Sequence, residues 1–199
     1  MRQPLATAPR GLILYRLNYW DKVVMAQKLF VSILLAIGCA QASFGAHHEA
    51  LIKDALSAAP PTLVDSVSVV DWDGNVLRQG TSDYTCMPTP PNVAGTQPMC
   101  LDGPWKTWAD AWSNKKPLNI KRLGISYMLV GDEGASNIDP YATGPTDDNE
   151  WIDEGPHLMI VVPDSSLLEG IPTDPSQGGP YVMWKGSPYQ HIMVPVGPR

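Results

Sequence analysis

The chain has 199 residues, with 14 Lys and Arg against 20 Asp and Glu and a net charge of −6. The first 46 residues carry five of the basic residues and one of the acidic ones, so the remainder has a net charge of −10. Such a surface repels phosphate backbones and anionic lipid headgroups, which argues against nucleic-acid binding. A divalent cation, a neutral ligand or a basic partner is easier to accommodate.

The first distinctive segment is an apolar stretch within residues 25–46. Lys28 gives it a basic start, and residues 29–37 form an apolar run that is followed by small residues. This order is typical of a secretory signal peptide, and the run is shorter than the roughly 20 apolar residues that span a bilayer. We therefore expect residues 1–24 to be an upstream extension outside the fold, 25–46 to be a signal peptide, and 47–199 to be a single exported domain, periplasmic or secreted.

A cysteine inside this segment offers a different mode of processing. Ala36-Ile-Gly-Cys39 resembles a bacterial lipobox, in which the cysteine is acylated and anchors the mature protein, although Leu is more typical than Ala at the first position. The alternative prediction is thus a lipoprotein tethered through Cys39. In both cases no transmembrane segment remains after processing.

Two cysteines, Cys86 and Cys100, remain once the signal segment is removed. In an oxidising compartment we predict a disulfide between them, which closes the Pro-rich segment 87–99. In the chain-entropy model such a loop closure contributes about 3 kcal/mol. The alternative is a metal site that combines these thiols with the neighbouring Met87 and Met99.

The chain after residue 46 contains 18 of the 20 Pro and alternates short apolar segments with loops. Helical spacing of apolar residues predicts helices at 48–58 and 104–112, and an Asp and a Gly delimit a short third helix at 164–170. β-branched or alternating segments predict strands at 66–72, 76–79, 83–86, 123–130, 157–162, 181–184 and 190–194. The fold class is α+β: a small, mainly antiparallel sheet, two or three short helices covering one face, long Pro/Gly-rich loops and one disulfide.

Three tryptophans mark the second predicted helix. Trp105, Trp108 and Trp112 lie on one face at helical spacing. Such a stripe can stack on sugars, but it is more often part of the core, because each indole buries a large area. We expect it to be core.

A near-repeat provides the most specific candidate site. His157-Leu-Met159 and His191-Ile-Met193 each place a histidine two residues before a methionine in a predicted strand, so each pair shares one face. Imidazole and thioether ligands suit copper, particularly Cu(I). The alternative is that the methionines fill the core and the histidines are hydrogen-bonded sheet residues.

Two weaker metal candidates remain. If cleavage follows Ala46, the free amine of His47 and the imidazole of His48 can chelate Cu(II) or Zn(II). The long acidic loop between Gly131 and Gly155 offers carboxylates to calcium, which is the lesser cofactor candidate; they are Asp132, Glu133, Asp139, Asp147, Asp148, Glu150, Asp153 and Glu154. A solvated surface is the favoured explanation of these residues.

No motif of a known catalytic class is present: there is no Gly-x-Ser-x-Gly, His-Glu-x-x-His, P-loop or Gly-x-Gly-x-x-Gly. The leading hypothesis is a small exported binding domain of undetermined ligand, with copper at the two His-x-Met strands as its most specific version. One alternative is a hydrolase-like enzyme that uses the acidic loop 132–154 and a histidine, although a non-catalytic protein is favoured. The other is a structural or surface-interaction module without a small ligand.

Overall fold

The computed structural model of the protein describes residues 45–93 and 95–199, and His47–Arg199 form one compact unit. The expected upstream extension, nearly all of the signal peptide and Cys39 lie outside the described residues. Within the described part of the chain, no helix has the length and apolar character needed to cross a membrane.

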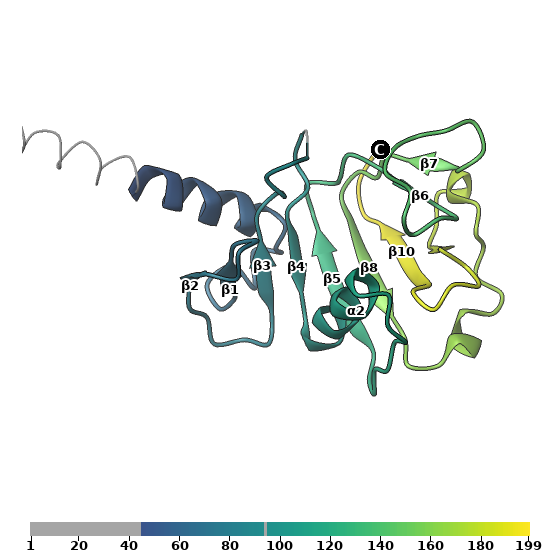
Figure 1. Cartoon of the computed structure of the whole chain (residues 1–199), viewed down its shortest axis with the longest axis horizontal. Helices are drawn as coiled ribbons and strands as arrows, with labels where there is room; N and C mark the ends of the chain where they lie inside the picture. Colours follow the sequence, from purple (N-terminus) through teal and green to yellow (C-terminus); the bar gives the residue numbers. More distant parts are fainter. Residues whose placement is uncertain (1–44, 94) are drawn as a thin grey trace, which may run out of the picture. The chain divides into compact units, whose positions relative to one another are not determined.

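The unit is built on one eight-stranded sheet with the strand order β2-β1-β3-β4-β5-β8-β10-β9 (Figure 1). The strands are, in chain order, β1 (Ser68–Val70), β2 (Val76–Arg78), β3 (Thr85–Met87), β4 (Met99–Leu101), β5 (Gly124–Met128), β8 (His157–Val161), β9 (Tyr181–Met183) and β10 (His191–Pro195). Neighbours pair antiparallel, except for the parallel pair β1 and β3. The mainly antiparallel class is confirmed, but the sheet is large rather than small.

Helices cover both faces of this sheet, not one face as predicted. A helix includes residues 45–57, and α2 (Gly103–Ser113) contacts β4, β5 and β8. The adjacent strand residues Cys100 and Leu101 point to opposite faces, and they belong to different core clusters. Leu101 packs with α2, whereas Cys100 packs with Ala55 at the end of the first helix.

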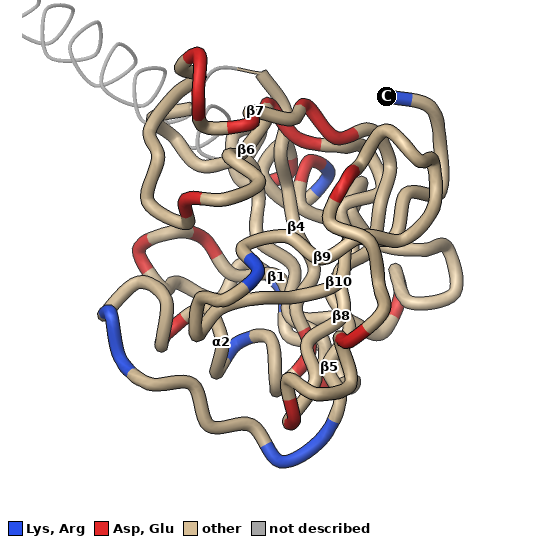
Figure 2. The backbone as a smooth tube through the Cα atoms, turned by 90° about the vertical axis from the view of Figure 1, so that its right-hand side faces the viewer, with Lys and Arg blue, Asp and Glu red and all other residues tan. Residues whose placement is uncertain are grey.

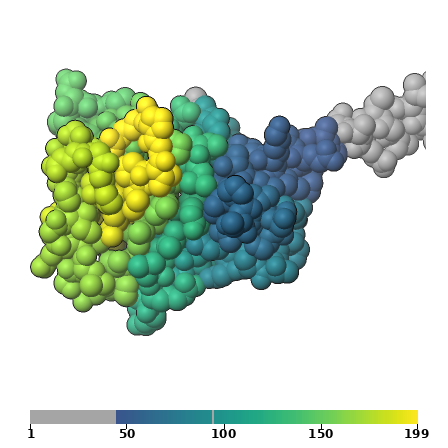
Figure 3. All heavy atoms as spheres, turned by 180° about the vertical axis from the view of Figure 1, so that it is seen from behind, coloured from purple at the N-terminus to yellow at the C-terminus, as the bar shows by residue number. Residues whose placement is uncertain are grey.

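The two faces are covered to different extents. The core cluster of the first helix reaches β1, β3 and β4 through Val67, Val69, Cys86 and Cys100. In the view from behind, the segment that follows residue 46 (blue) covers only one end of the sheet, and the C-terminal segment (yellow) lies at the surface (Figure 3). The larger core therefore lies on the α2 side.

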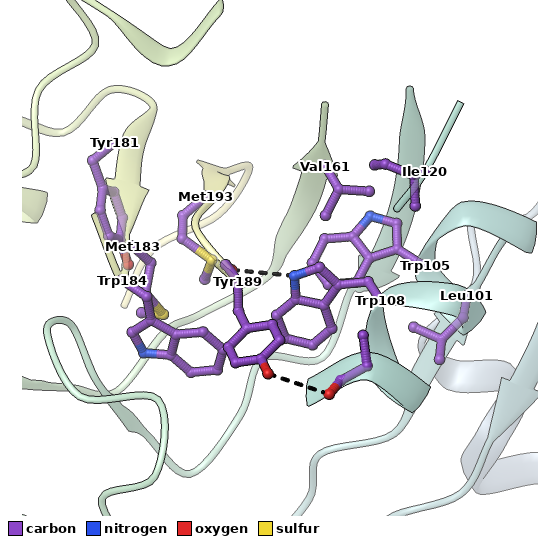
Figure 4. Packing of buried hydrophobic residues seen from close by; sticks show 11 residues of the cluster. Leu101, Trp105, Trp108, Ile120, Val161, Tyr181, Met183, Trp184, Tyr189 and Met193 are labelled. Carbon is purple, nitrogen blue, oxygen red and sulfur yellow. Dashed lines mark hydrogen bonds between the residues drawn. The ribbon is translucent and has the colours of Figure 1, made fainter. Parts of the chain in front are cut away.

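The tryptophans of α2 are core residues, as expected. Trp105 and Trp108 are buried (Figure 4), and Trp112 is partly buried against the same cluster. Their indole N–H groups donate to backbone carbonyls of Met159, Tyr189 and Pro140, at 3.1, 3.1 and 2.9 Å. Each indole is thus hydrogen-bonded, and those of Trp105 and Trp108 are also buried.

The disulfide Cys86–Cys100 is confirmed, and both cysteines are fully buried. The two residues lie directly opposite each other in the antiparallel pair β3 and β4. The predicted third helix is instead a short 3-10 turn, η1 (Ser165–Leu168), and a second such turn, η2 (Pro175–Gln177), lies in a segment predicted as loop. These turns are too short to form α-helices.

Candidate functional site

The segment predicted as a long acidic loop remains mostly loop, but two short strands close it into a hairpin. Its strands are β6 (Ala135–Ser136) and β7 (Trp151–Ile152), which pair antiparallel. Trp184, directly after β9, ties the hairpin to the core by donating its indole N–H to the carbonyl of Ser136 at 2.6 Å. We call residues 131–155 the acidic hairpin; Figure 2 shows Asp and Glu around β6 and β7. The hairpin gives its carboxylates a fixed frame.

A cavity of about 820 Å³ lies between the acidic hairpin and the residues that flank position 94, and we call it the acidic cleft. Glu133 and Asp153 contribute carboxylates to its lining, Trp151 contributes an indole, and Gln97 and Thr143 contribute neutral polar groups. No Lys, Arg or His is among its described lining residues. The cleft is therefore acidic and carries one aromatic ring.

Local hydrogen bonds orient the two carboxylates. Oδ1 of Asp153 accepts the indole N–H of Trp151 at 3.2 Å, and Oε1 of Glu133 accepts the N–H of Thr96 at 2.8 Å. The backbone of Gly134 packs directly against the Trp151 indole and the Asp153 carboxylate. Its φ is +100°, and a Cβ there would collide with the indole nitrogen and with Oδ1 of Asp153. Each carboxylate thus accepts one hydrogen bond from the described residues through one of its oxygens.

A second cavity of about 440 Å³ shares the wall 142–144 with the acidic cleft. It is lined by Asp139, Asp148 and Tyr141, so it too is acidic and aromatic. Nζ of Lys115 lies 4.6 Å from the centroid of the Tyr141 ring. The ring beside this cavity therefore already contacts a cation of the protein itself.

A buried ionic cluster lies behind the acidic cleft. The carboxylate of Glu154 is buried; its Oε1 accepts the hydroxyl of Tyr181 at 2.9 Å and Nη2 of Arg199 at 2.9 Å. The backbone N–H of Glu154 donates to Oδ1 of Asp132 at 3.1 Å. Burial raises the pKa of Asp132, while the nearby His157 lowers it. This cluster joins the base of the hairpin to the core.

The predicted copper ligands lie on neighbouring strands, and Met159 is directly opposite Met193. Because β8 and β10 run antiparallel, His157 and His191 lie at opposite ends of this methionine pair. Four strand residues separate them, which is about 13 Å along the sheet. The structure therefore keeps each histidine beside a methionine, but it does not bring the two imidazoles together.

Both imidazoles are oriented in the same way. Nδ1 of His157 lies 2.8 Å from the carbonyl of Gly155, and Nδ1 of His191 lies 3.0 Å from the carbonyl of Tyr189. Since a carbonyl can only accept, Nδ1 carries the proton and Nε2 is left as an acceptor, as in metal-ligating histidines. Nε2 of His157 is buried and has no hydrogen-bond partner among the described residues.

The surroundings of His191 are aromatic. Its ring meets those of Trp105, Trp108 and Trp184 edge-on, with centroids 5.1 to 5.4 Å apart. Burial in this apolar site, with a smaller contribution from the charge of His157, lowers the pKa of His191 to about 4. His191 is therefore neutral at physiological pH.

The weaker metal candidates are placed as follows. His47 and His48 are exposed in the first helix, and Nε2 of His48 lies 3.0 Å from the carbonyl of Leu77. Over residues 45–93 and 95–199, no three His, Cys, Asp or Glu side chains gather in a geometry that could hold a metal ion. Copper, calcium and the terminal chelate stay predictions.

The sequence reasoning singled out the acidic segment, but it missed Trp151 and Gly134. An indole two residues before Asp153, inside a run of carboxylates, was an available signal. The position of the Trp151 indole depends on Gly134. The two residues are in contact only because the hairpin brings them together.

Comparison of the chain with protein-family models, with curated proteins and with solved structures finds no match. The function is therefore argued from the chemistry of the site.

Proposed function

We propose that the protein is an exported, non-catalytic binding domain whose acidic cleft holds a small organic cation, such as a polyamine or the side chain of a basic peptide. The observation that carries this proposal is the joint placement of Glu133, Asp153 and the Trp151 indole around one cavity that has no basic residue among its described lining residues. The disulfide supports an oxidising compartment.

The chemistry of the lining favours an organic cation over other ligands. Two carboxylates and a net charge of −10 beyond residue 46 repel anions and attract cations from a distance. An aromatic ring adds cation–π attraction, which favours alkylammonium and guanidinium groups. A volume of about 820 Å³ is within the range of small-molecule sites.

The hydrolase-like alternative combines the acidic loop with a histidine, and the cleft supplies carboxylates but no histidine among its described lining residues. General acid–base work requires a proton-transferring group within hydrogen-bond reach of the substrate. The histidine nearest in sequence, His157, is fully buried in the core and is not part of the cleft lining. The lining therefore supports binding better than catalysis.

The test is isothermal titration of the oxidised protein with spermidine at low ionic strength. The double variant Glu133→Gln with Asp153→Asn removes both cleft charges and should weaken binding at least tenfold. A matched control, Asp65→Asn with Glu169→Gln, removes two exposed charges outside the cleft lining and should change binding less than threefold. No binding by the wild type, or equal loss in both double variants, would contradict the proposal.

Copper is a second candidate, favoured by the free Nε2 of His157 beside the Met159 and Met193 pair. An imidazole acceptor and two thioethers suit Cu(I). Titration of the reduced metal into the wild type and into Met159→Leu with Met193→Leu tests it. Binding weaker than micromolar, or unchanged binding in the variant, would exclude this site.

A further inference from the structure

The carboxylate of Asp132 bridges the two ends of the acidic hairpin. Its Oδ1 accepts the backbone N–H of Gly134 at 2.9 Å and that of Glu154 at 3.1 Å. The backbone N–H of Asp132 donates to the carbonyl of Glu154 at 2.9 Å. One oxygen atom thus holds two segments that are twenty residues apart.

The two amides bonded by Asp132 belong to the cleft. The N–H of Gly134 is part of the peptide that follows Glu133, and the N–H of Glu154 is part of the peptide that follows Asp153. Both peptide planes next to the cleft carboxylates are therefore fixed by the same acceptor. Asp132 itself is absent from the cleft lining among the described residues.

The position of Asp132 is electrostatically unfavourable. Burial and the neighbouring Glu154 both oppose its negative charge, and His157 offsets only part of this. A carboxylate in such a place is destabilising unless its hydrogen bonds compensate. The hydrogen bonds of Asp132 to the amides of Gly134 and Glu154 supply this compensation, and they also fix the geometry of the hairpin.

We propose that Asp132 is a positioning residue that sets the separation of Glu133 and Asp153, so that the cleft selects its cation by carboxylate geometry and not by total charge. This inference rests on the proposed function. It predicts that the shape of the side chain at position 132 matters for binding more than its charge does.

Three variants separate geometry from charge. Asp132→Asn removes the charge but keeps an oxygen at the bridging position, Asp132→Glu keeps the charge but displaces the carboxylate by one methylene, and Asp132→Ala removes both. In a titration with spermidine, the affinity of Asp132→Asn should be within threefold of the wild-type affinity. The affinities of Asp132→Glu and Asp132→Ala should be at least tenfold weaker. The reverse order, with Glu close to the wild type and Asn as weak as Ala, would overturn the proposal.

Amide hydrogen exchange tests the bridge without any ligand. The N–H groups of Gly134 and Glu154 should be protected in the wild type and in Asp132→Asn, and should exchange at least tenfold faster in Asp132→Glu. Equal protection in all of these proteins would refute the positioning role. If the wild type shows this protection but does not bind spermidine, the proposed function fails and the bridge stands. Near-UV circular dichroism identifies any variant that has lost its fold.

Discussion

Asp132, His157 and His191 are polar residues in buried surroundings, and each makes hydrogen bonds to the backbone. Asp132 accepts two backbone amides, and each histidine donates Nδ1–H to the carbonyl two residues before it. A buried polar group without such partners costs about 1–3 kcal/mol. The hydrogen bond from Nδ1 of His191 to the carbonyl of Tyr189 therefore helps to explain how this imidazole can be buried among three indoles.

The low pKa of His191 makes the metal-free protein sensitive to acid. The unfolded chain binds a proton near pH 6.5, whereas burial holds the pKa of the folded protein at about 4. Stability from this group is therefore complete above pH 6.5, and it is lost as the pH falls to 4, by about 3 kcal/mol in total. His191→Phe keeps a ring among the indoles and should flatten this loss, as measured by urea unfolding at pH 7 and pH 4. An unchanged pH dependence would show that another group carries it.

Gly134 is expected to be intolerant of any side chain. Gly134→Ala places a methyl group against the indole of Trp151 and strains a backbone with φ +100°. We expect a destabilisation of about 2 kcal/mol and a weaker affinity for spermidine. Gly179→Ala is the control, because a Cβ there meets no atom within 4 Å and the residue is not among the described lining residues of the cleft. Equal behaviour of the two variants would contradict the packing described here.

At the residue scale, the sequence was informative where contacts follow a simple period. The alternation of strand residues placed His157 and Met159 on one face, and the count of cysteines identified Cys86 and Cys100. The roles of Asp132 and Trp151 were not predictable, because they depend on hydrogen bonds and packing across a hairpin.

At the scale of elements, strands with an apolar or β-branched pattern were predictable, including the three-residue strands β1, β2, β3 and β9, whereas β4, β6 and β7 were not. β5, β8 and β10 follow clear apolar patterns, whereas β4 has three residues, follows Pro98 and contains no β-branched side chain. β6 and β7 have two residues each, so no period can be recognised. The sheet therefore turned out larger than predicted.

The disulfide links two of these short strands. Because the disulfide closes the Pro-rich segment between β3 and β4, we expect Cys86→Ala with Cys100→Ala to lower the free energy of unfolding by about 3 kcal/mol. Urea unfolding of the variant and of the dithiothreitol-reduced wild type should give similar losses. A variant as stable as the oxidised protein would contradict this.

Asp102 joins α2 to the sheet. Its Oδ1 accepts the N–H of Trp105 at the start of the helix, and its Oδ2 accepts the N–H of Ile125 in β5. Asp102→Ala removes the helix cap and leaves a strand amide unpaired, which should cost about 3 kcal/mol. Thr107→Ala, on the exposed side of the same helix, should cost less than about 0.5 kcal/mol. Similar losses of stability in both variants would contradict the role of Asp102 in connecting α2 to the sheet.

At the scale of the whole molecule, the two helices lie on opposite faces, although one covered face was predicted. Periodicity identifies the apolar side of a helix, but it does not say which face of a sheet that side meets. Cys100 and Leu101 belong to different core clusters, and this shows that the two helices pack on different faces. Which strands each helix meets depends on the strand order.

Export is a prediction about the whole chain. N-terminal sequencing and mass spectrometry of the protein from an expressing bacterium should give a mature chain that begins at His47. An acyl group on Cys39 would support the tethered alternative. A mature chain that begins near Met1 would contradict export.

The central claim is that the acidic cleft binds an organic cation, and a spermidine titration of the ¹⁵N-labelled protein followed by NMR tests it most directly. The claim predicts saturable shifts of the Trp151 indole N–H and of the backbone amides of Gly134 and Thr143, with little change at the indole of the buried Trp105. The absence of shifts at these cleft groups, or shifts spread evenly over the acidic surface, would contradict it.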